Sequence, residues 1–517
     1  IHYNINSDTD PTITIPTAQL VFYDERLGYR IYELSKPLQP GESTKIKIEI
    51  DYISEGFENG TGNTSIVRNG TFLNNRVIPQ MGYNSSAEIS DKNDRIKFEL
   101  PPKDRMPELY EGDSCTTGCM TNYLSEGRSD WIKTETFIST SADQIAIAPG
   151  SLVKEWKEGE RNYYHYKVDV PSQDFTSFVS ARFQVAKRDW KGISLEVYYD
   201  EKHAYNTDLM LDAIQKSLEY YIKNFGPYYH KQARIIEFPN YATFAQAFPG
   251  TMPYSESFGF IIDLEDTTKN NVIDAVVSHE MAHQWWAHQL VGANMQGGTM
   301  LSEAFAEYSS LMVMKQKKSP LEMKEFLKYD FNRYLRGRGR ETEKELPLYK
   351  VENQQYIHYG KGSVILYALQ DYIGEEKVNK AMSGFLAEFR YRAPPYPTSL
   401  DFIRYLEPQI PDSLNYLIDD WFKTITLYDF RLNEATYVKN EAGKYEVTLQ
   451  MENRKLKADT IGNEKEVPLN DWVDVGLFKD GEGKELLALE RIMFSTTNQS
   501  YTFTVDTIPA KAAIDPK

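Results

Sequence analysis

The sequence predicts a multidomain α+β protein with a β-rich N-terminal domain, a helix-rich middle domain and a C-terminal β-sandwich. At 517 residues the chain is too long for one compact core, so several domains are expected. The apolar residues alternate with polar ones over residues 1–190, follow a helical spacing over 191–428, and alternate again over 429–517. These three changes of pattern set the expected domain boundaries. A large helical domain after the last β region is not expected.

The N-terminal region is expected to consist of short strands joined by turns. Alternation of apolar and polar residues occurs in TKIKIEIDYI, RIKFEL, TFISTSADQIAIAPG and YYHYKVDV. Clusters of Gly, Asn, Asp and Pro separate these segments, as turns require. Long helical periodicity is absent from this part of the sequence, so we predict a β-rich domain.

The middle region carries amphipathic helices. An i, i+3, i+4 apolar stripe occurs in LMLDAIQKSLEYYIKNFG, VIDAVVSHEMAHQWWAHQLV, MLSEAFAEYSSLMVMKQ, YIHYGKGSVILYALQDYIG and KVNKAMSGFLAEF. Alternation then returns in YEVTLQME, WVDVGLFKD and YTFTVDT, with DGEG as a turn signal. This return predicts the terminal β-sandwich.

The composition excludes some classes of function. A formal net charge of −17 repels phosphate backbones, so nucleic acid is not an expected partner. The sequence has no apolar run long enough to span a membrane. Cys115 and Cys119 lie in DSCTTGCM, where a disulfide and two reduced thiols are both open. A zinc knuckle does not fit, because no second Cys/His pair accompanies them.

The motif HEMAH indicates a metal site with hydrolytic chemistry. His279 and His283 are four residues apart, so on a helix their imidazoles share a face and can bind one zinc ion. Glu280 lies one step round the helix, where it reaches a metal-bound water without being a ligand. The flanking residues are apolar, and polar groups placed among them are costly without a partner.

A catalytic zinc ion needs a third protein ligand, which the helix in LSEAFAEYSSLM supplies. Glu303 follows His283 after 19 intervening residues, enough for a turn and a return. Glu307 shares the face of Glu303 and is either the acceptor of a ligand imidazole's free N–H or a solvated helix charge. His288 lies off the ligand face, so we expect it to be structural.

These motifs resemble those of the aminopeptidase N-like gluzincins, the family that includes leukotriene-A hydrolase. HEMAHQWWAHQLV is similar to its HExxHQWFGNLV, LSEAFAEY to LNEGFAxY, and HYGKGSVILYAL to YEKGxxVLxML; IDDWF also recurs in order. The resemblance covers most of the chain and implies a saddle-like N-terminal domain, a thermolysin-like catalytic domain and a bound zinc ion. It also implies that Tyr359 donates a hydrogen bond to the developing oxyanion.

The sequence departs from the family at three places. The spacing before Glu303 is one residue longer than usual, and we expect the extra residue in the loop. In the stretch MPYSESFGF, Glu256 takes the position that binds a substrate's free α-amine, where the family's exopeptidase signature is altered. The family's second amine-binding residue falls near Asn69 or Gly70, neither of which is a carboxylate.

The sequence therefore predicts a zinc-dependent aminopeptidase acting on peptides. In the expected mechanism Glu280 is the general base, Tyr359 stabilises the oxyanion and Glu256 holds the N-terminus of the peptide. One alternative is an endopeptidase or dipeptide-releasing enzyme, because the amine site is altered. Another is a zinc-binding receptor or assembly module with little catalysis. The chain is expected to be an extracytoplasmic ectodomain of a longer membrane-anchored protein, with a cytoplasmic enzyme as the alternative.

Overall fold

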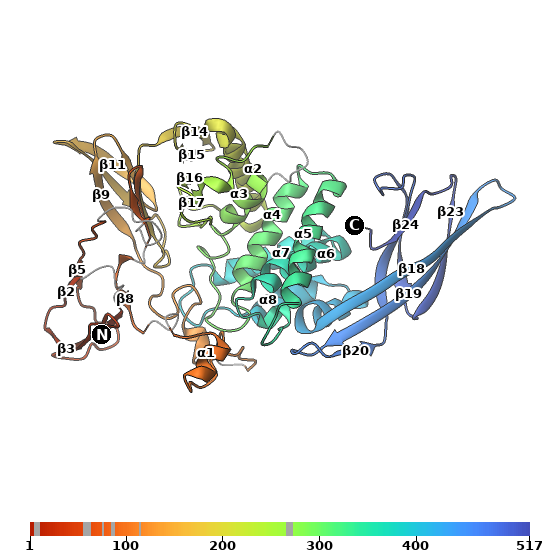
Figure 1. Ribbon diagram of the computed structural model, residues 1–517, viewed down its shortest axis with the longest axis horizontal. Coiled ribbons are helices and arrows are strands. Elements are labelled where there is room, and N and C mark those ends of the chain that lie inside the picture. Colours follow the sequence, from red (N-terminus) through yellow and green to blue (C-terminus); the bar gives the residue numbers. More distant parts are fainter. Residues whose placement is uncertain are drawn as a thin grey trace. The chain divides into compact units, whose positions relative to one another are not determined.

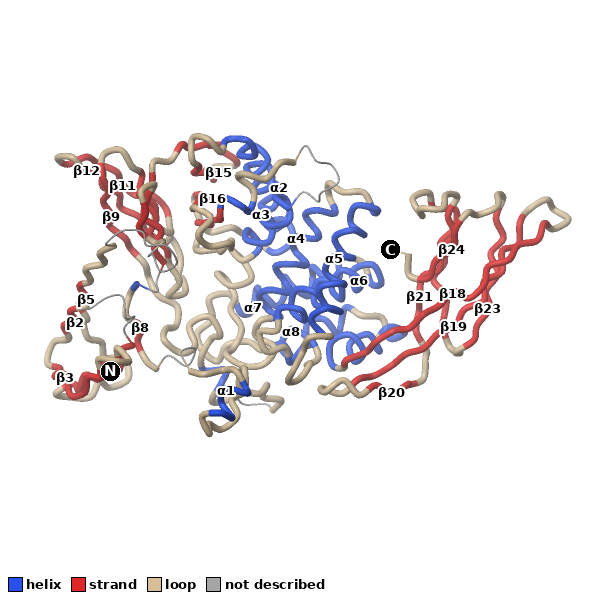
Figure 2. The backbone as a smooth tube through the Cα atoms, in the orientation of Figure 1, coloured by secondary structure: helices blue, strands red, loops and turns tan. Residues whose placement is uncertain are grey.

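The computed structural model describes residues 1–4, 11–54, 64–74, 77–83, 88–112, 115–264 and 272–516. The chain forms two compact units, each made of two segments: Ile1–Val313 with Glu375–Leu406, and Met314–Gly374 with Glu407–Lys517. The many sheets and helices confirm a multidomain α+β protein (Figures 1 and 2). The domain boundaries at 190 and 428 stay predictions. Among the described helices, none combines the length and the apolar character that a membrane crossing requires.

The first part of unit one consists mainly of antiparallel strands, which Figure 2 shows in red. They form four sheets: β1 (His2–Asn4), β3 (Ala18–Asp24), β4 (Tyr29–Leu34) and β8 (Gln80–Met81); β2 (Thr12–Thr14) and β5 (Lys47–Glu49); β6 (Ile66–Val67), β7 (Gly70–Asn74), β10 (Ile145–Ile147) and β13 (Ser177–Ala181); and β9 (Glu135–Ser141), β11 (Ser151–Glu158) and β12 (Arg161–Lys167). The β-rich character expected from the alternation is therefore present.

The strand predicted at RIKFEL is wrong. This segment contributes to a short helix, α1 (Lys92–Lys97), which the Asp91 side chain caps by accepting from the backbone N–H groups of Asn93 and Asp94. An N-cap of this kind satisfies two of the backbone donors that a helix start leaves free. Local capping therefore outweighs the alternating pattern, which covers too few residues to fix a strand.

The second part of unit one combines a sheet with helices. Strands β14 (Gln184–Trp190), β15 (Ile193–Tyr199), β16 (Gln232–Phe238) and β17 (Thr251–Ser255) form the sheet, with β15, β16 and β17 parallel. The helical segments are η4 (Ala204–Asn206), α2 (Thr207–Phe225), η5 (Glu256–Phe258), α3 (Val272–Ala282), η6 (Met300–Ala304), α4 (Phe305–Lys315), α7 (Glu375–Phe389) and α8 (Ser399–Leu406). α2 packs against both β15 and α3 (Figure 1).

Buried aromatic rings hold the helices of unit one together. Phe305 of α4 contacts Phe385 of α7 and Phe402 of α8, with ring centroids 6.4 and 4.6 Å apart. Each of the three rings is fully buried, so each contributes about 1.5–3 kcal/mol through its apolar area. α7 and α8 follow in sequence only after a long segment that belongs to unit two.

Unit two contains a helical part and a strand-rich part. Its helical segments are α5 (Pro320–Arg338), η7 (Leu348–Lys350), η8 (Tyr356–Lys361), α6 (Gly362–Ile373), η9 (Glu407–Gln409), η10 (Asp412–Leu414) and η11 (Ile418–Lys423). α5 was not predicted, although Ser319 and Glu322 form a capping box and Pro320 occupies the first position of the helix. This capping signature is the sequence signal from which α5 could have been predicted.

Two antiparallel sheets follow in unit two. One contains β18 (Ile425–Lys439), β19 (Tyr445–Ala458), β20 (Glu464–Val467) and β23 (Asn498–Val505); the other contains β21 (Asp471–Phe478), β22 (Leu486–Phe494) and β24 (Lys511–Ile514). Alternate residues of β19, β21, β22 and β23 join one buried apolar cluster, which includes Leu449, Val475 and Phe503. The period-two pattern of the sequence places these side chains on one face.

Candidate metal centre

The structure brings His279, His283 and Glu303 together in unit one. The Nε2 atoms of the two histidines are 3.1 Å apart, and Glu303 Oε2 lies 3.4 Å from His279 Nε2 and 3.5 Å from His283 Nε2. Ligands at about 2.1 Å around a tetrahedral zinc ion lie about 3.4 Å from one another. The three atoms therefore fit one zinc ion, with a fourth position left for another ligand.

The helices explain how these side chains meet. α3 ends at Ala282, earlier than the sequence pattern predicted, but the N–H of His283 still donates to the carbonyl of His279 over 3.3 Å. The two imidazoles consequently remain one helical turn apart and on one face. Glu303 arrives on the next helical segment of the described chain, η6.

η6 is a π-helical turn, which takes up one more residue than an α-helical turn does. We predicted the extra residue between His283 and Glu303 to lie in the loop. That placement stays a prediction, although the π-helical turn around Glu303 shows that the helix itself also takes up an additional residue. The Glu303 Oε2 atom is buried without a hydrogen-bond partner, as expected of an oxygen that serves a metal ion.

The carboxylates of this cluster favour positive charge on the neighbouring imidazoles. Burial disfavours the charged form of His279, yet Glu303 and Glu307 raise its pKa well above the ordinary value. Burial also opposes ionisation of Glu303, but His283 and His279 hold the pKa of this carboxyl well below its usual range. A metal cation supplies the same positive charge without a proton.

Each histidine is oriented by a second contact. Glu307 Oε2 lies 2.6 Å from His279 Nδ1. Of the two roles considered for Glu307, this distance fits the one in which its carboxylate accepts a hydrogen bond from the imidazole. The Nδ1 of His283 lies 3.1 Å from the carbonyl oxygen of Trp286. Nδ1–H donation leaves Nε2 of each ring free to ligate a metal.

Glu280 lies in the same helix and is 7 % exposed. Burial raises the pKa of Glu280, while the imidazoles of His283 and His279 act in the opposite direction. A carboxyl whose pKa is moved toward neutral pH can both accept and return a proton. Its environment therefore suits the general base that the sequence predicts.

The structure groups Glu256 with residues other than the metal ligands. Its Oε1 accepts from the backbone N–H of Asn240, and its Oε2 lies 4.0 Å from His203 Nδ1; His203 in turn contacts Glu237. These three side chains form a second group of donor atoms, and Asn69 lines the same pocket of about 110 Å³. Asn69 and Glu256 therefore line one pocket, and an amine site there stays a prediction.

Glu256 lies in η5, which packs against α3. The N–H of Gly250 donates to Gln284 over 2.8 Å, and the backbone at Gly259 packs against Ile273. β17 and η5 therefore run alongside α3 toward its start. From Ile273 to the two ligand histidines the helix rises roughly 9 to 15 Å. The role of Glu256 as amine anchor stays a prediction.

Tyr359 belongs to unit two. It lies in the π-helical segment η8, where the guanidinium of Arg333 stands 4.4 Å from the centre of its ring. Its role as oxyanion donor stays a prediction. His288 lies in unit one, with Nε2 2.9 Å from the carbonyl oxygen of Ala247, and burial lowers its pKa to about 3. A neutral, buried histidine bonded to backbone agrees with the structural role expected for it.

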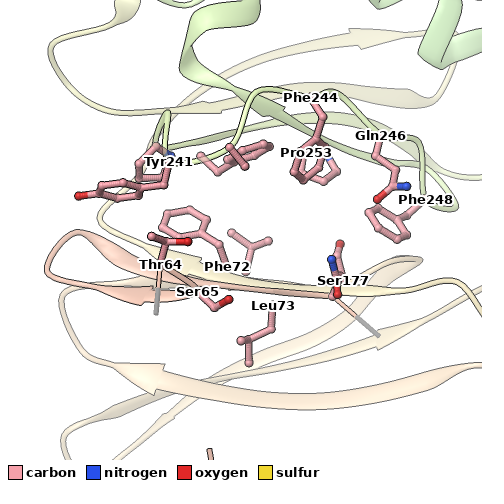
Figure 3. Close-up of a pocket in the computed structure, with 15 residues that line it drawn as sticks. Thr64, Ser65, Phe72, Leu73, Ser177, Tyr241, Phe244, Gln246, Phe248 and Pro253 are labelled. Carbon is pink, nitrogen blue, oxygen red and sulfur yellow. The ribbon is translucent and has the colours of Figure 1, made fainter. Parts of the chain in front are cut away.

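An apolar pocket lies in unit one beside the segment that ends α3. Its volume is about 150 Å³, and Figure 3 shows Phe72 and Leu73 on one side and Phe244, Phe248 and Pro253 on the other. The Gln284 side chain donates to the carbonyl of Phe248 over 3.1 Å. The pocket wall is therefore hydrogen-bonded directly to Gln284, the residue after His283.

Two features of the site were not specified by the sequence. Cys115 and Cys119 form a disulfide, which decides between the two open alternatives. Tyr123 follows this loop, and its hydroxyl is buried without a hydrogen-bond partner. Burial and the nearby Glu303 carboxylate raise the pKa of Tyr123, so it stays a neutral donor. No local pattern marks Tyr123, which is one of 36 tyrosines in the sequence.

The part of the chain that holds this site is similar to known peptidases. The family model described as "Peptidase family M1 domain" matches residues 209–421. Human endoplasmic reticulum aminopeptidase 2 is 28% identical over 210 residues, which cover 39% of this chain and 22% of the human protein. Probable aminopeptidase 1 of Sulfurisphaera tokodaii is 23% identical over 316 residues, covering 56% of this chain and 40% of that protein.

A solved structure supports the fold over nearly the whole chain. The crystal structure of Legionella pneumophila aminopeptidase A in complex with aspartic acid matches with a TM-score of 0.57 at 13% identity. The match covers 99% of this chain and 54% of the Legionella chain. The chain thus spans about half or less of the length of these relatives.

Proposed function

We propose that this chain, whose residues 209–421 match the peptidase family M1 domain, is a zinc-dependent aminopeptidase of the aminopeptidase N-like gluzincins. The observation that carries the proposal is the group of His279, His283 and Glu303, whose donor atoms lie 3.1 to 3.5 Å apart. Glu280 is buried in the same motif. A purely structural zinc site would need no such base.

The proposed mechanism assigns each step to a residue of this chain. His279, His283 and Glu303 hold the metal, and a bound zinc ion supplies Lewis acidity toward a carbonyl and a lowered pKa for water. Glu280 takes the proton of the attacking water and later delivers it to the leaving amine. Tyr359 donates a hydrogen bond to the negative oxygen that develops on the substrate.

The apolar pocket of Figure 3 offers a place for a substrate side chain. Phe72, Phe244 and Phe248 line it, and its wall segment is bonded to Gln284. Burying an apolar side chain there stabilises the complex by about 1.5–3 kcal/mol. We therefore expect peptides that begin with an apolar residue to be preferred over those that begin with a charged one.

The assignment is tested with a peptide series carrying free or acetylated N-termini, with products identified by mass spectrometry. Stepwise removal of single residues from free N-termini is the expected result, since an exopeptidase recognises the α-ammonium group. Glu256→Gln, which removes the negative charge of the predicted anchor, should raise KM for free peptides. Equal cleavage of acetylated peptides would discard the exopeptidase assignment and keep the zinc hydrolase.

A second candidate function is an endopeptidase or dipeptide-releasing enzyme. The observation favouring it is that Glu256, the predicted amine anchor, already contacts Asn240 and His203. Internal cuts, or release of dipeptides, in the same peptide series would select this candidate. A receptor or assembly module with little catalysis would release no product from any peptide.

Replacing Glu307 by Gln should weaken zinc binding by about 10- to 100-fold, because the ion pair with His279 Nδ1 fixes the ring. Zinc affinity is measured by competition with a chromophoric chelator. The matched control is Glu219→Gln on α2, a carboxylate bonded to Gln215 and Lys216 away from the cluster. Unchanged affinity in the Glu307 variant would assign Glu307 to the solvated surface.

The finer architecture and the location are also proposals. We assign residues 1–190 to a saddle-like N-terminal β-domain, 191–428 to a thermolysin-like catalytic domain and 429–517 to a β-sandwich. The two sheets of unit two that share one apolar cluster support the last assignment. An extracytoplasmic location is supported by the disulfide between Cys115 and Cys119, since disulfides persist in oxidising compartments.

A further inference from the structure

The ring of Tyr359, the proposed oxyanion donor, has a cation over its face. The guanidinium carbon of Arg333 stands 4.4 Å from the centre of this ring. The face of an aromatic ring is electron-rich, so it attracts a guanidinium at this distance. We propose that Arg333 is a positioning residue that holds the Tyr359 ring and makes its O–H a stronger hydrogen-bond donor. This inference rests on the proposed function, in which Tyr359 stabilises the oxyanion.

The charge of Arg333 acts on Tyr359 and not on a carboxylate. Within the described ranges of the chain, Arg333 forms no ion pair, and its side chain donates to the neutral Oε1 of Gln355 over 3.5 Å. Gln355 directly precedes η8, so both contacts of the guanidinium go to the segment that carries Tyr359. Without a carboxylate partner, the positive charge is not neutralised beside the ring.

A second ring contact restrains Tyr359. The imidazole of His358 meets the Tyr359 ring edge to face, with ring centroids 4.4 Å apart and planes at 80°. His358 is buried, whereas Tyr359 and Arg333 are half-buried. The Tyr359 ring therefore has a buried imidazole and a guanidinium as neighbours.

Close backbone packing sets Arg333 against Tyr359. Gly360 follows Tyr359, and a Cβ added at Gly360 would lie 2.8 Å from the backbone nitrogen of Tyr334. The same Cβ would lie 2.9 Å from the carbonyl oxygen of Asp330. Because Tyr334 directly follows Arg333 on α5, the residues next to the two side chains are in contact, which fixes their relative position.

The expected effect is on the transition state. As negative charge develops on the substrate oxygen, the phenolic O–H is drawn further toward that oxygen and electron density builds up on the phenol. A cation over the ring stabilises this density more than it stabilises the ground state. An interaction that strengthens only in the transition state changes kcat and leaves KM unaltered.

Steady-state kinetics on the best peptide tests the inference. Arg333→Met, which removes the charge, should lower kcat by about 3- to 30-fold at an unchanged KM. Arg333→Lys keeps a cation and should recover part of this loss. The control is Arg336→Met, the same change at an exposed arginine of α5, which should keep the wild-type kcat.

A double-mutant cycle separates action through the hydroxyl from a general structural effect. Tyr359→Phe keeps the ring under Arg333 but removes the hydroxyl, so Arg333→Met should add little to the loss in this background. Wild-type kcat in Arg333→Met, or an equal fold loss in both backgrounds, overturns the inference. An Arg333→Lys variant no more active than Arg333→Met would assign the effect to shape and overturn it as well.

Failure of the proposed function gives a different result. Wild-type kcat in Tyr359→Phe would remove the oxyanion step of the proposed function, and this inference with it. A lowered kcat in Tyr359→Phe beside wild-type kcat in Arg333→Met would overturn this inference alone.

Discussion

Replacing Glu280 by Gln is expected to lower kcat by about 10²- to 10⁴-fold while zinc remains bound. The amide keeps the size of the side chain but cannot accept the proton of the attacking water. The ligand atoms of His279, His283 and Glu303 are untouched, because Glu280 contributes none of the three. The measurement pairs steady-state kinetics on the best peptide with the zinc content of the purified variant.

The control for this substitution is Glu219→Gln, the same chemical change on α2, where the carboxylate is bonded to Lys216 and Gln215. It should turn over like the wild type. Retained turnover in Glu280→Gln would contradict the mechanism, since no other residue is proposed to accept the proton of the attacking water. Lost zinc in this variant would assign Glu280 to the metal site itself.

The second large effect is expected in unit two, where Lys455→Met should destabilise the fold by about 3–5 kcal/mol. The Lys455 ammonium is buried between Asp420, which it contacts closely, and Asp471, whose Oδ1 is 3.0 Å away. Asp420 and Asp471 are 4% and 2% exposed. Removing the cation leaves two buried carboxylates, of which Asp420 keeps only Lys457, 3.1 Å away, as a cationic partner within the described chain.

Chemical denaturation followed by circular dichroism measures this loss, with Lys444→Met as the control. Lys457 also contacts the buried Asp420 at 3.1 Å and therefore belongs to the same cluster. Lys444 pairs with Asp506 at 3.3 Å with its side chain 52% exposed, so Lys444→Met should cost about 1 kcal/mol or less. If the two variants prove equally stable, the buried triad contributes nothing beyond a surface ion pair. Hydrogen exchange should locate the loss of protection in β19 and β21, which carry Lys455 and Asp471.

Local spacing explains what the sequence could predict. His279 and His283 meet because four residues make one helical turn, and α2 and α7 follow from long apolar stripes. The strand at RIKFEL was wrong because six residues of alternation weigh less than the Asp91 cap. The end of α3 at Ala282 was missed because the residues after it remain apolar and buried.

Contacts between distant segments explain what the sequence could not predict. The backbone N–H of Tyr123 donates to the carbonyl of Gly292, and neither residue carries a local signal for that pairing. The grouping of Glu256 with His203 and Glu237 depends on the adjacent ends of strands β15, β16 and β17. Such groupings follow from the order of strands in a sheet, which single-sequence patterns do not specify.

Unit one consists of two chain segments separated by part of unit two, and this affects how the protein folds during synthesis. The chain is synthesised from its N-terminus, and domains generally fold as units as they emerge. All the metal-cluster residues precede Val313, yet Phe385 and Phe402, which pack on Phe305, come after unit two has begun. A ribosome must therefore complete α8 before the helix that follows Glu303 is fully covered. A nascent chain stalled ahead of α7 should expose that aromatic surface to chaperones, and one released beyond α8 should not.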